Sequence, residues 1–202
     1  MSTPSFVVRQ PAWRWFPAQT TGITPAARSG YGAALFDNSL CIAGGYDGKA
    51  GLDDAHVLDL DTLRWRSLYL HRRPAEAGFG DRFLFGHTRI GGVIFVHGGM
   101  SSKNLNNVRS DLIAVDCAGS TLTTLQMSGD DPGPWSRSTM AAMSNSLWVV
   151  GGWDGKSWRD DLFRVRLGPG RVADVTAATW EKVETTGCCC GHLLTGRFGE
   201  AR

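Results

Sequence analysis

No part of the 202-residue sequence is apolar over the roughly 18 residues that a membrane-spanning helix needs. The N-terminal segment MSTPSFVVRQPAW also lacks a charged stretch followed by a long apolar core, so a secretory signal is not indicated. The cysteines are odd in number and form no spaced framework, which argues against a disulfide-stapled secreted domain; they are Cys41, Cys117, Cys188, Cys189 and Cys190. We therefore expect a cytoplasmic or nuclear protein that makes no contact with membranes.

An excess of charge of one sign is missing too. Lysine and arginine together number 21 against 19 acidic residues, and a net charge of +2 does not indicate nucleic-acid binding. Arginine outnumbers lysine 17 to 4. That ratio would suit the binding of carboxylates or phosphates, but a bias in genomic base composition explains it equally well.

Glycine and tryptophan are abundant. The chain has 26 glycines and 8 tryptophans, and it is 42% hydrophobic, which excludes a disordered tail. Glycine at this level without a collagen period indicates many tight turns between short strands.

A Gly-Gly motif repeats along the chain. The string GGYDGK at residues 44–49 recurs as GGWDGK at residues 151–156, and a third pair, Gly98 and Gly99, lies midway. Between the second glycines of successive pairs the period is 54 and then 53 residues. A regular period of this length predicts a repeat architecture.

Other features recur around each pair. An apolar run of strand length precedes it, namely LCIA, VIFVH and LWVV. An aspartate heads the next apolar segment: Asp54, Asp111 and Asp161. An arginine opens each unit: Arg28, Arg82 and Arg137. A tryptophan lies in the closing strand of the first and third units, Trp65 and Trp180. Each unit therefore reads as four short strands.

This pattern resembles the kelch repeat, in which each unit folds as one four-stranded blade of a β-propeller. The resemblance predicts an all-β, kelch-type β-propeller with about three complete blades and flanking strands. One flanking strand is expected at Trp15, because WFPAQTTG aligns with WEKVETTG at Trp180, and TGRFGEA around Arg197 resembles the opening of a further unit. The predicted organisation is an N-terminal tail at 1–12, kelch repeats at 13–187 with blades at about 28–68, 82–127 and 137–183, and a cysteine-rich segment with the start of another repeat at 188–202.

Three blades are too few for a normal closed ring, because propellers usually have four to eight. We expect the chain to be part of a longer protein, a truncated product, or a piece that another chain completes. Open blade edges also predict self-association.

The loops that leave the Gly-Gly pairs are the candidate binding surface. In substrate-adapter members of the kelch family such loops and the arginines that open each unit line the partner-binding mouth. The resemblance thus implies a protein or peptide partner, with nucleic acid excluded, and a scaffold or adapter function. The candidate partner-binding residues are Tyr46, Met100, Trp153, Arg28, Arg82 and Arg137. The alternative is that the rings are partly buried turn residues and that the arginines pair with aspartates across blades.

An enzyme is the second hypothesis, because kelch-type propellers include copper oxidases and iron-dependent specifier proteins. The sequence shows no catalytic constellation, ligand spacing or phosphate-binding loop, so we expect no enzymatic activity, cofactor or metal. The run Cys188, Cys189, Cys190 with His192 has the wrong spacing for structural zinc. Two interpretations of this run remain: a loop of thiols that is open to oxidation or acylation, or a segment without function.

Overall fold

The computed structural model describes residues 15–74 and 78–185. They form an all-β structure, in which the described residues contain one short 3₁₀ turn, Val172–Asp174, as their helical element. The fold is a partial kelch-type β-propeller, as predicted, and the described residues do not close into a ring.

Three five-stranded sheets make up the blades. The first has the order β1 (Thr21–Gly22), β5 (Arg64–Ser67), β4 (Ala55–Asp59), β3 (Ser39–Ala43) and β2 (Gly32–Phe36). The second has the order β6 (His71–Arg73), β12 (Thr121–Thr124), β11 (Leu112–Asp116), β9 (Val93–His97) and β8 (Gly86–Ile90). The third has the order β13 (Gln126–Gly129), β17 (Ala177–Val183), β16 (Trp158–Leu167), β15 (Ser146–Trp153) and β14 (Thr139–Met143). A small two-stranded sheet joins β7 (Arg82–Phe83) to β10 (Met100–Ser101).

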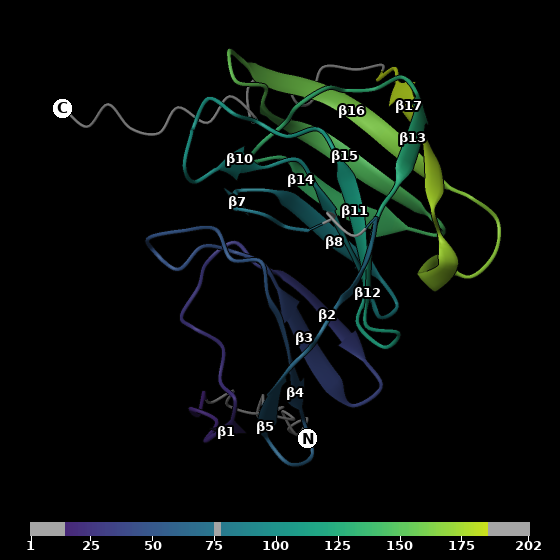
Figure 1. Cartoon of the computed structure of the whole chain (residues 1–202). Helices are drawn as coiled ribbons and strands as arrows, with labels where there is room; N and C mark the ends of the chain where they lie inside the picture. Colours follow the sequence, from purple (N-terminus) through teal and green to yellow (C-terminus); the bar gives the residue numbers. More distant parts are fainter. Residues whose placement is uncertain (1–14, 75–77, 186–202) are drawn as a thin grey trace, which may run out of the picture.

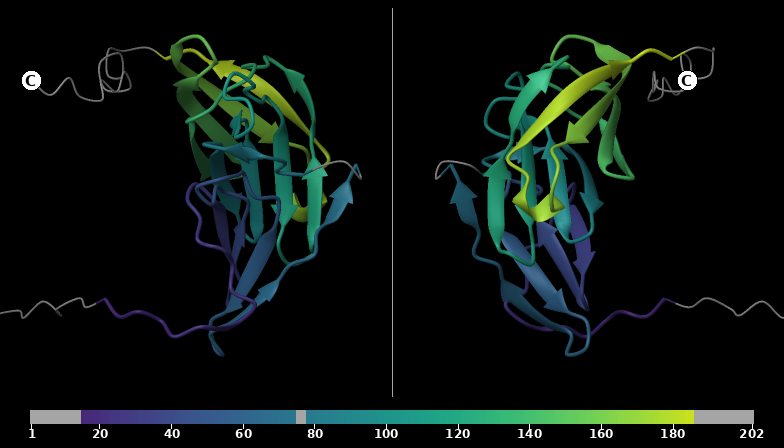
Figure 2. Two further views of the ribbon diagram at one scale, coloured as in Figure 1. Left: turned by 60° about the vertical axis from the view of Figure 1, so that its left-hand side comes forward. Right: turned by 90° about the vertical axis from the view of Figure 1, so that its right-hand side faces the viewer.

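The blades follow one another in chain order, with the second between the first and the third (Figure 1). Both turned views agree with this order (Figure 2). One apolar cluster lies between the first and second blades and includes Cys41, Val57, Ile94 and Ile113. A second cluster lies between the second and third blades and includes Phe95, Leu112, Trp135, Phe163 and Trp180. The second blade therefore buries both of its faces, and the first and third blades bury the face that packs against it, as expected of stacked repeats.

The outermost strand of each sheet comes from the linker that precedes the blade's own strands. β1, β6 and β13 pair in parallel with β5, β12 and β17, whereas the other neighbours within each blade are antiparallel. This fifth strand covers an edge whose N–H and C=O groups would otherwise be unpaired. Whether the chain self-associates through its remaining edges stays a prediction.

The flanking strand predicted at Trp15 is not formed. Residues 15–20 belong to no strand, and the Trp15 side chain is 98% exposed. The nearby residues Thr21–Gly22 instead become the outer strand of the first blade. The alignment with Trp180 located the TTG segment but assigned it to the wrong blade.

The Gly-Gly pairs allow the blades to approach closely. All six of these glycines have positive φ values, for example +67° at Gly98 and +92° at Gly99. A Cβ atom on Gly98 would overlap the carbonyl oxygen of Trp135 in the next blade. A side chain at this position would therefore be strained by its backbone and would also push two blades apart.

The closing-strand tryptophans differ in burial. Trp180 is 2% exposed and packs with Phe163 in the second cluster. Trp65 occupies the matching place in the first blade but is only half-buried. The sequence predicted the same core role for both rings, and the structure confirms this role for Trp180 alone.

Candidate partner-binding face

The three loops that follow the Gly-Gly pairs start in the same way. Tyr46 and Trp153 form isolated β-bridges with Ser29 and Ser136, and Met100 pairs with Phe83 in the β7–β10 sheet. The bridged partner is in each case part of the segment that enters the blade's first long strand. The loops therefore occupy equivalent places on one face of the blades.

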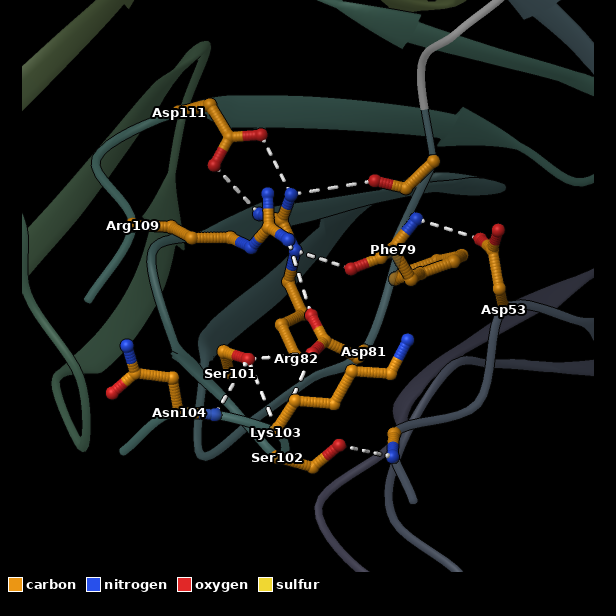
Figure 3. A network of polar contacts seen from close by, with 12 residues as sticks. Asp53, Phe79, Asp81, Arg82, Ser101, Ser102, Lys103, Asn104, Arg109 and Asp111 are labelled. Carbon is orange, nitrogen blue, oxygen red and sulfur yellow. Dashed lines mark hydrogen bonds and ion pairs between the residues drawn. The ribbon is translucent and has the colours of Figure 1, made fainter. Parts of the chain in front are cut away.

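Arg28 and Arg82 are buried and form ion pairs with aspartates. Arg82 is 1% exposed and donates two hydrogen bonds of 2.7 Å to the carboxylate of Asp111 (Figure 3). It also donates to the carbonyl of Phe79 at 2.7 Å. Arg28 binds Asp54 through two hydrogen bonds, of 2.5 and 3.0 Å, and its side chain is 3% exposed.

Both pairs join the start of a unit to the aspartate that precedes its third long strand. The arginines thus pair with aspartates, as the alternative interpretation predicted, but within one blade rather than across blades. Burial raises the pKa of Asp54, but hydrogen bonds from Arg28 and His56 outweigh it, so the pKa lies below its ordinary value. These arginines hold parts of one blade together, which favours the alternative interpretation over a place on the partner-binding surface.

A second polar network fixes the loop of the second blade (Figure 3). Asp81 accepts hydrogen bonds from Ser101 Oγ and from Arg109 Nη2, the latter at 3.2 Å. The Ser102 N–H donates to the Asp81 carbonyl at 2.8 Å. The hydrogen bond from Ser101, followed by that from Arg109, keeps the pKa of Asp81 below its ordinary value. Asp81 is therefore charged at neutral pH and orders the loop.

Arg137 is not the equivalent of Arg28 and Arg82. The first residues of β2, β8 and β14 are Gly32, Gly86 and Thr139, each paired with the residue before a Gly-Gly pair. Four residues before them are Arg28, Arg82 and Trp135. Trp135 thus replaces the arginine in the third blade.

The true counterparts of Arg137 are Gly30 and Leu84. All three have positive φ values, +59°, +56° and +58° in chain order. The Arg137 N–H donates to the Leu84 carbonyl at 2.7 Å, and its side chain is exposed. No ion pair of Arg137 is formed with the residues that the structure describes.

The aspartate of the third blade pairs with different cations. Asp161 corresponds to Asp54 and Asp111 but binds Arg159 at 2.8 Å and Lys182 at 3.0 Å. Burial raises the pKa of Asp161, and the hydrogen bonds from Lys182 and Arg159 bring it below its ordinary value. In the third blade the buried arginine of the first two blades is thus replaced by two more exposed cations, Arg159 and Lys182.

Arg137 lines a pocket of about 250 Å³ together with Met100, Trp153 and Trp158. We call this the Trp pocket. Trp153 and Trp158 pair across the β15–β16 hairpin, with ring centroids 5.5 Å apart in an edge-to-face arrangement, and Trp158 is 50% exposed. Three of the six predicted residues therefore meet at one site, and Trp158 was missed. The signal was the contrast between GGWDGKSW and GGYDGKAG, where Gly51 takes the place of Trp158.

Tyr46 lies outside the Trp pocket. Its ring stacks on Phe83 of the second blade, with centroids 4.9 Å apart. Gly51 packs so closely on the backbone of Asp81 that a Cβ atom there would overlap it. The loop of the first blade is thus docked on its neighbour, which matches the alternative that Tyr46 is a partly buried turn residue.

Within residues 15–74 and 78–185, no three His, Cys, Asp or Glu side chains gather closely enough to hold a metal ion. No helix in the described part of the chain is long and apolar enough to cross a membrane. The predicted segment of Cys188, Cys189, Cys190 and His192 lies outside the described residues.

Comparison with known proteins gives a match to one family model and to several relatives. Residues 27–68 match the model of the Kelch motif. The chain is 29% identical to Acyl-CoA-binding domain-containing protein 5 of Arabidopsis thaliana, over 77% of this chain and 23% of the relative. It is 24% identical to Kelch domain-containing protein 3 of Bos taurus, over 88% of this chain and 48% of the relative. Kelch repeat-containing protein 2 of Saccharomyces cerevisiae is 27% identical over 70% of this chain and 17% of the relative. The chain therefore spans between about a sixth and a half of the length of these relatives.

Proposed function

We propose that this chain, which belongs to the kelch-repeat family, is a protein-interaction module that binds its partner at the Trp pocket. Kelch repeats commonly serve as interaction modules, and the similarity to kelch relatives supports a protein partner. The finer role that we propose is that of a scaffold or adapter. The observation that carries the proposal is the meeting of two indole rings, a methionine and an unpaired arginine at one exposed pocket.

The composition of the Trp pocket matches that of binding hot spots. Tryptophan and arginine dominate such sites because large rings exclude water and guanidinium groups make several hydrogen bonds. Trp158 remains half-exposed although it lies against Trp153, so its outer face is available to a ligand. Met100 is buried below and provides an adaptable apolar surface.

The geometry also indicates what kind of segment fits. Arg137 is held by its backbone hydrogen bond to Leu84, and its guanidinium makes no ion pair within the described residues. A carboxylate could take two parallel hydrogen bonds from it. We therefore propose a peptide segment that places an apolar side chain between the rings and a carboxylate on Arg137.

Affinity capture with the wild-type chain as bait, followed by mass spectrometry, tests this function. The test variants are Trp158→Ala and Arg137→Gln. The matched control is Tyr69→Ala, which removes an 81% exposed ring that lies outside the Trp pocket. A partner that is retained by wild type and by Tyr69→Ala but lost by both test variants supports the proposal. Equal retention of every partner by all four proteins would refute it.

A further inference from the structure

A lysine occupies the same place in all three Gly-Gly loops. The sequences are GGYDGK, GGMSSK and GGWDGK, so each lysine comes four residues after the second glycine. The chain contains 4 lysines against 17 arginines, and three of the four are at these positions. We call Lys49, Lys103 and Lys156 the lysine arc.

The same local turn presents each of the three lysines. The backbone N–H of each one donates to a side-chain oxygen two residues earlier. The acceptors are Asp47 Oδ1 at 2.8 Å, Ser101 Oγ at 3.1 Å and Asp154 Oδ1 at 2.8 Å. The three side chains therefore leave equivalent points of three successive blades.

Contacts between the loops make the arc continuous. The Gly51 N–H of the first loop donates to Ser102 Oγ of the second loop at 3.1 Å. Gly155 of the third loop lies so close to the second loop that a Cβ atom there would be 3.6 Å from Val108 Cγ2. Lys156 belongs to the same loop as Trp153 and Trp158, two residues that line the Trp pocket.

The lysines of the arc have unused charge. All three are exposed, and none forms an ion pair with an acidic residue in the part of the chain that the structure describes. Lys182, the fourth lysine, instead pairs with Asp161 at 3.0 Å. Each lysine of the arc has a carboxylate close to its own turn, which accepts a hydrogen bond from its backbone N–H: Asp47 for Lys49, Asp81 for Lys103 and Asp154 for Lys156. An ammonium group on a flexible stem suits loose contacts with charged groups at the rim of an interface.

We propose that the lysine arc binds an extended acidic segment of the partner protein, with carboxylates facing one lysine on each blade. This inference rests on the proposed function, since it extends the peptide from the Trp pocket across the neighbouring blades. A protein segment fits better than nucleic acid, because the net charge of the chain is only +2 and does not indicate nucleic-acid binding.

A fluorescently labelled peptide, Glu₄-Leu-Glu₄, is the probe, and anisotropy gives its Kd. The test variant carries Lys49→Gln, Lys103→Gln and Lys156→Gln. The matched control carries Arg64→Gln, Arg66→Gln and Arg171→Gln, which removes the same charge from exposed residues elsewhere. We expect the test variant to weaken the Kd about tenfold or more and the control to change it less than about twofold. Replacing the three lysines by arginine should preserve binding, because the positive charge remains.

Two results would overturn the proposal. One is an equal loss of peptide binding in the test and control variants, which would mean that only net charge matters. The other is tighter binding of an oligothymidylate of equal charge than of the peptide, which would indicate nucleic acid instead. Trp158→Ala keeps the two proposals distinguishable. If it abolishes capture of the native partner while the lysine variant does not, the arc fails and the Trp pocket stands; the reverse pattern rejects the Trp pocket.

Discussion

Arg82 and Asp111 form an ion pair in which the arginine is 1% exposed while the aspartate side chain is 32% exposed. The two partners therefore differ in their access to water. Asp111 can still be hydrated when Arg82 is removed, whereas Arg82 cannot be hydrated when Asp111 is removed. This pair ties the start of the second unit to the strand β11 and leaves no free guanidinium for a partner.

The unequal burial makes a prediction about stability. Asp111→Ala leaves a buried arginine without its carboxylate and should lower the free energy of unfolding by about 3–5 kcal/mol. Arg82→Met should cost less, because Asp111 can turn to water. Urea denaturation of the two variants measures the difference. A larger loss for Arg82→Met would show that the pair is not organised as described.

The third blade has Trp135 where the first two blades have an arginine, and this difference gives a second prediction. Trp135→Ala should lower stability by about 3–5 kcal/mol, since it removes a buried ring that packs against Phe163. Arg137→Gly should instead raise stability by up to about 1 kcal/mol, because φ at this position is +58°. Thermal unfolding compares both with wild type. Destabilisation by Arg137→Gly would contradict the left-handed backbone at this residue.

His97 should make stability depend on pH. It is fully buried next to Trp180, with ring centroids 5.0 Å apart, and burial lowers its pKa from 6.5 to about 4. Between pH 6.5 and about 4, His97 is therefore protonated in the unfolded chain but neutral in the folded chain. Stability should be complete above pH 6.5 and should fall as the pH drops towards 4, by on the order of 3 kcal/mol in all.

The control for this pH dependence is His97→Leu. Its stability should change less than that of wild type between pH 6.5 and 5, above the range in which the aspartates with lowered pKa values become protonated. The slope that remains comes from His87, because burial lowers its pKa too. Guanidinium denaturation at a series of pH values gives both curves. The same slope in wild type and variant would assign the effect to other groups.

The blades could be predicted well because the residues that define each strand lie close together in the sequence. Apolar runs before each Gly-Gly pair and an aspartate after it define strands such as β9 and β11 without any knowledge of the fold. The fifth strands were missed, because HRR in β6 and QMSG in β13 show no apolar alternation and become strands only by pairing with an edge. Pairing with a strand of the same blade about 50 residues later in the chain is not visible in the local sequence pattern.

The candidate site was predicted only in part, for two physical reasons. Arg137 was matched to Arg28 and Arg82 because an arginine opens each unit, but the register of β14 on β15 shows that Trp135 is the counterpart. Trp158 lies five residues after Trp153 and reaches it only because the hairpin turns back. The burial of Arg82 likewise depends on contacts with Phe79 and Asp111, which the repeat pattern does not contain.

The two closing-strand tryptophans make a third prediction about stability. Trp180→Ala should lower the free energy of unfolding by about 3–5 kcal/mol, because the ring lies between two blades. Trp65→Ala should cost clearly less, since its ring is half-buried. Urea unfolding of both variants at one protein concentration makes the comparison. Equal losses would mean that Trp65 is covered as fully as Trp180.

The measurement that tests the central claim most directly is the Kd of the captured partner for wild type and for Trp158→Gly, determined by calorimetry. This substitution gives the third loop the residue that the first loop has at Gly51. The Trp pocket predicts a Kd about 5- to 150-fold weaker, corresponding to about 1–3 kcal/mol, with little change in melting temperature. An unchanged Kd with an unchanged melting temperature would contradict the assignment of the Trp pocket as the binding site.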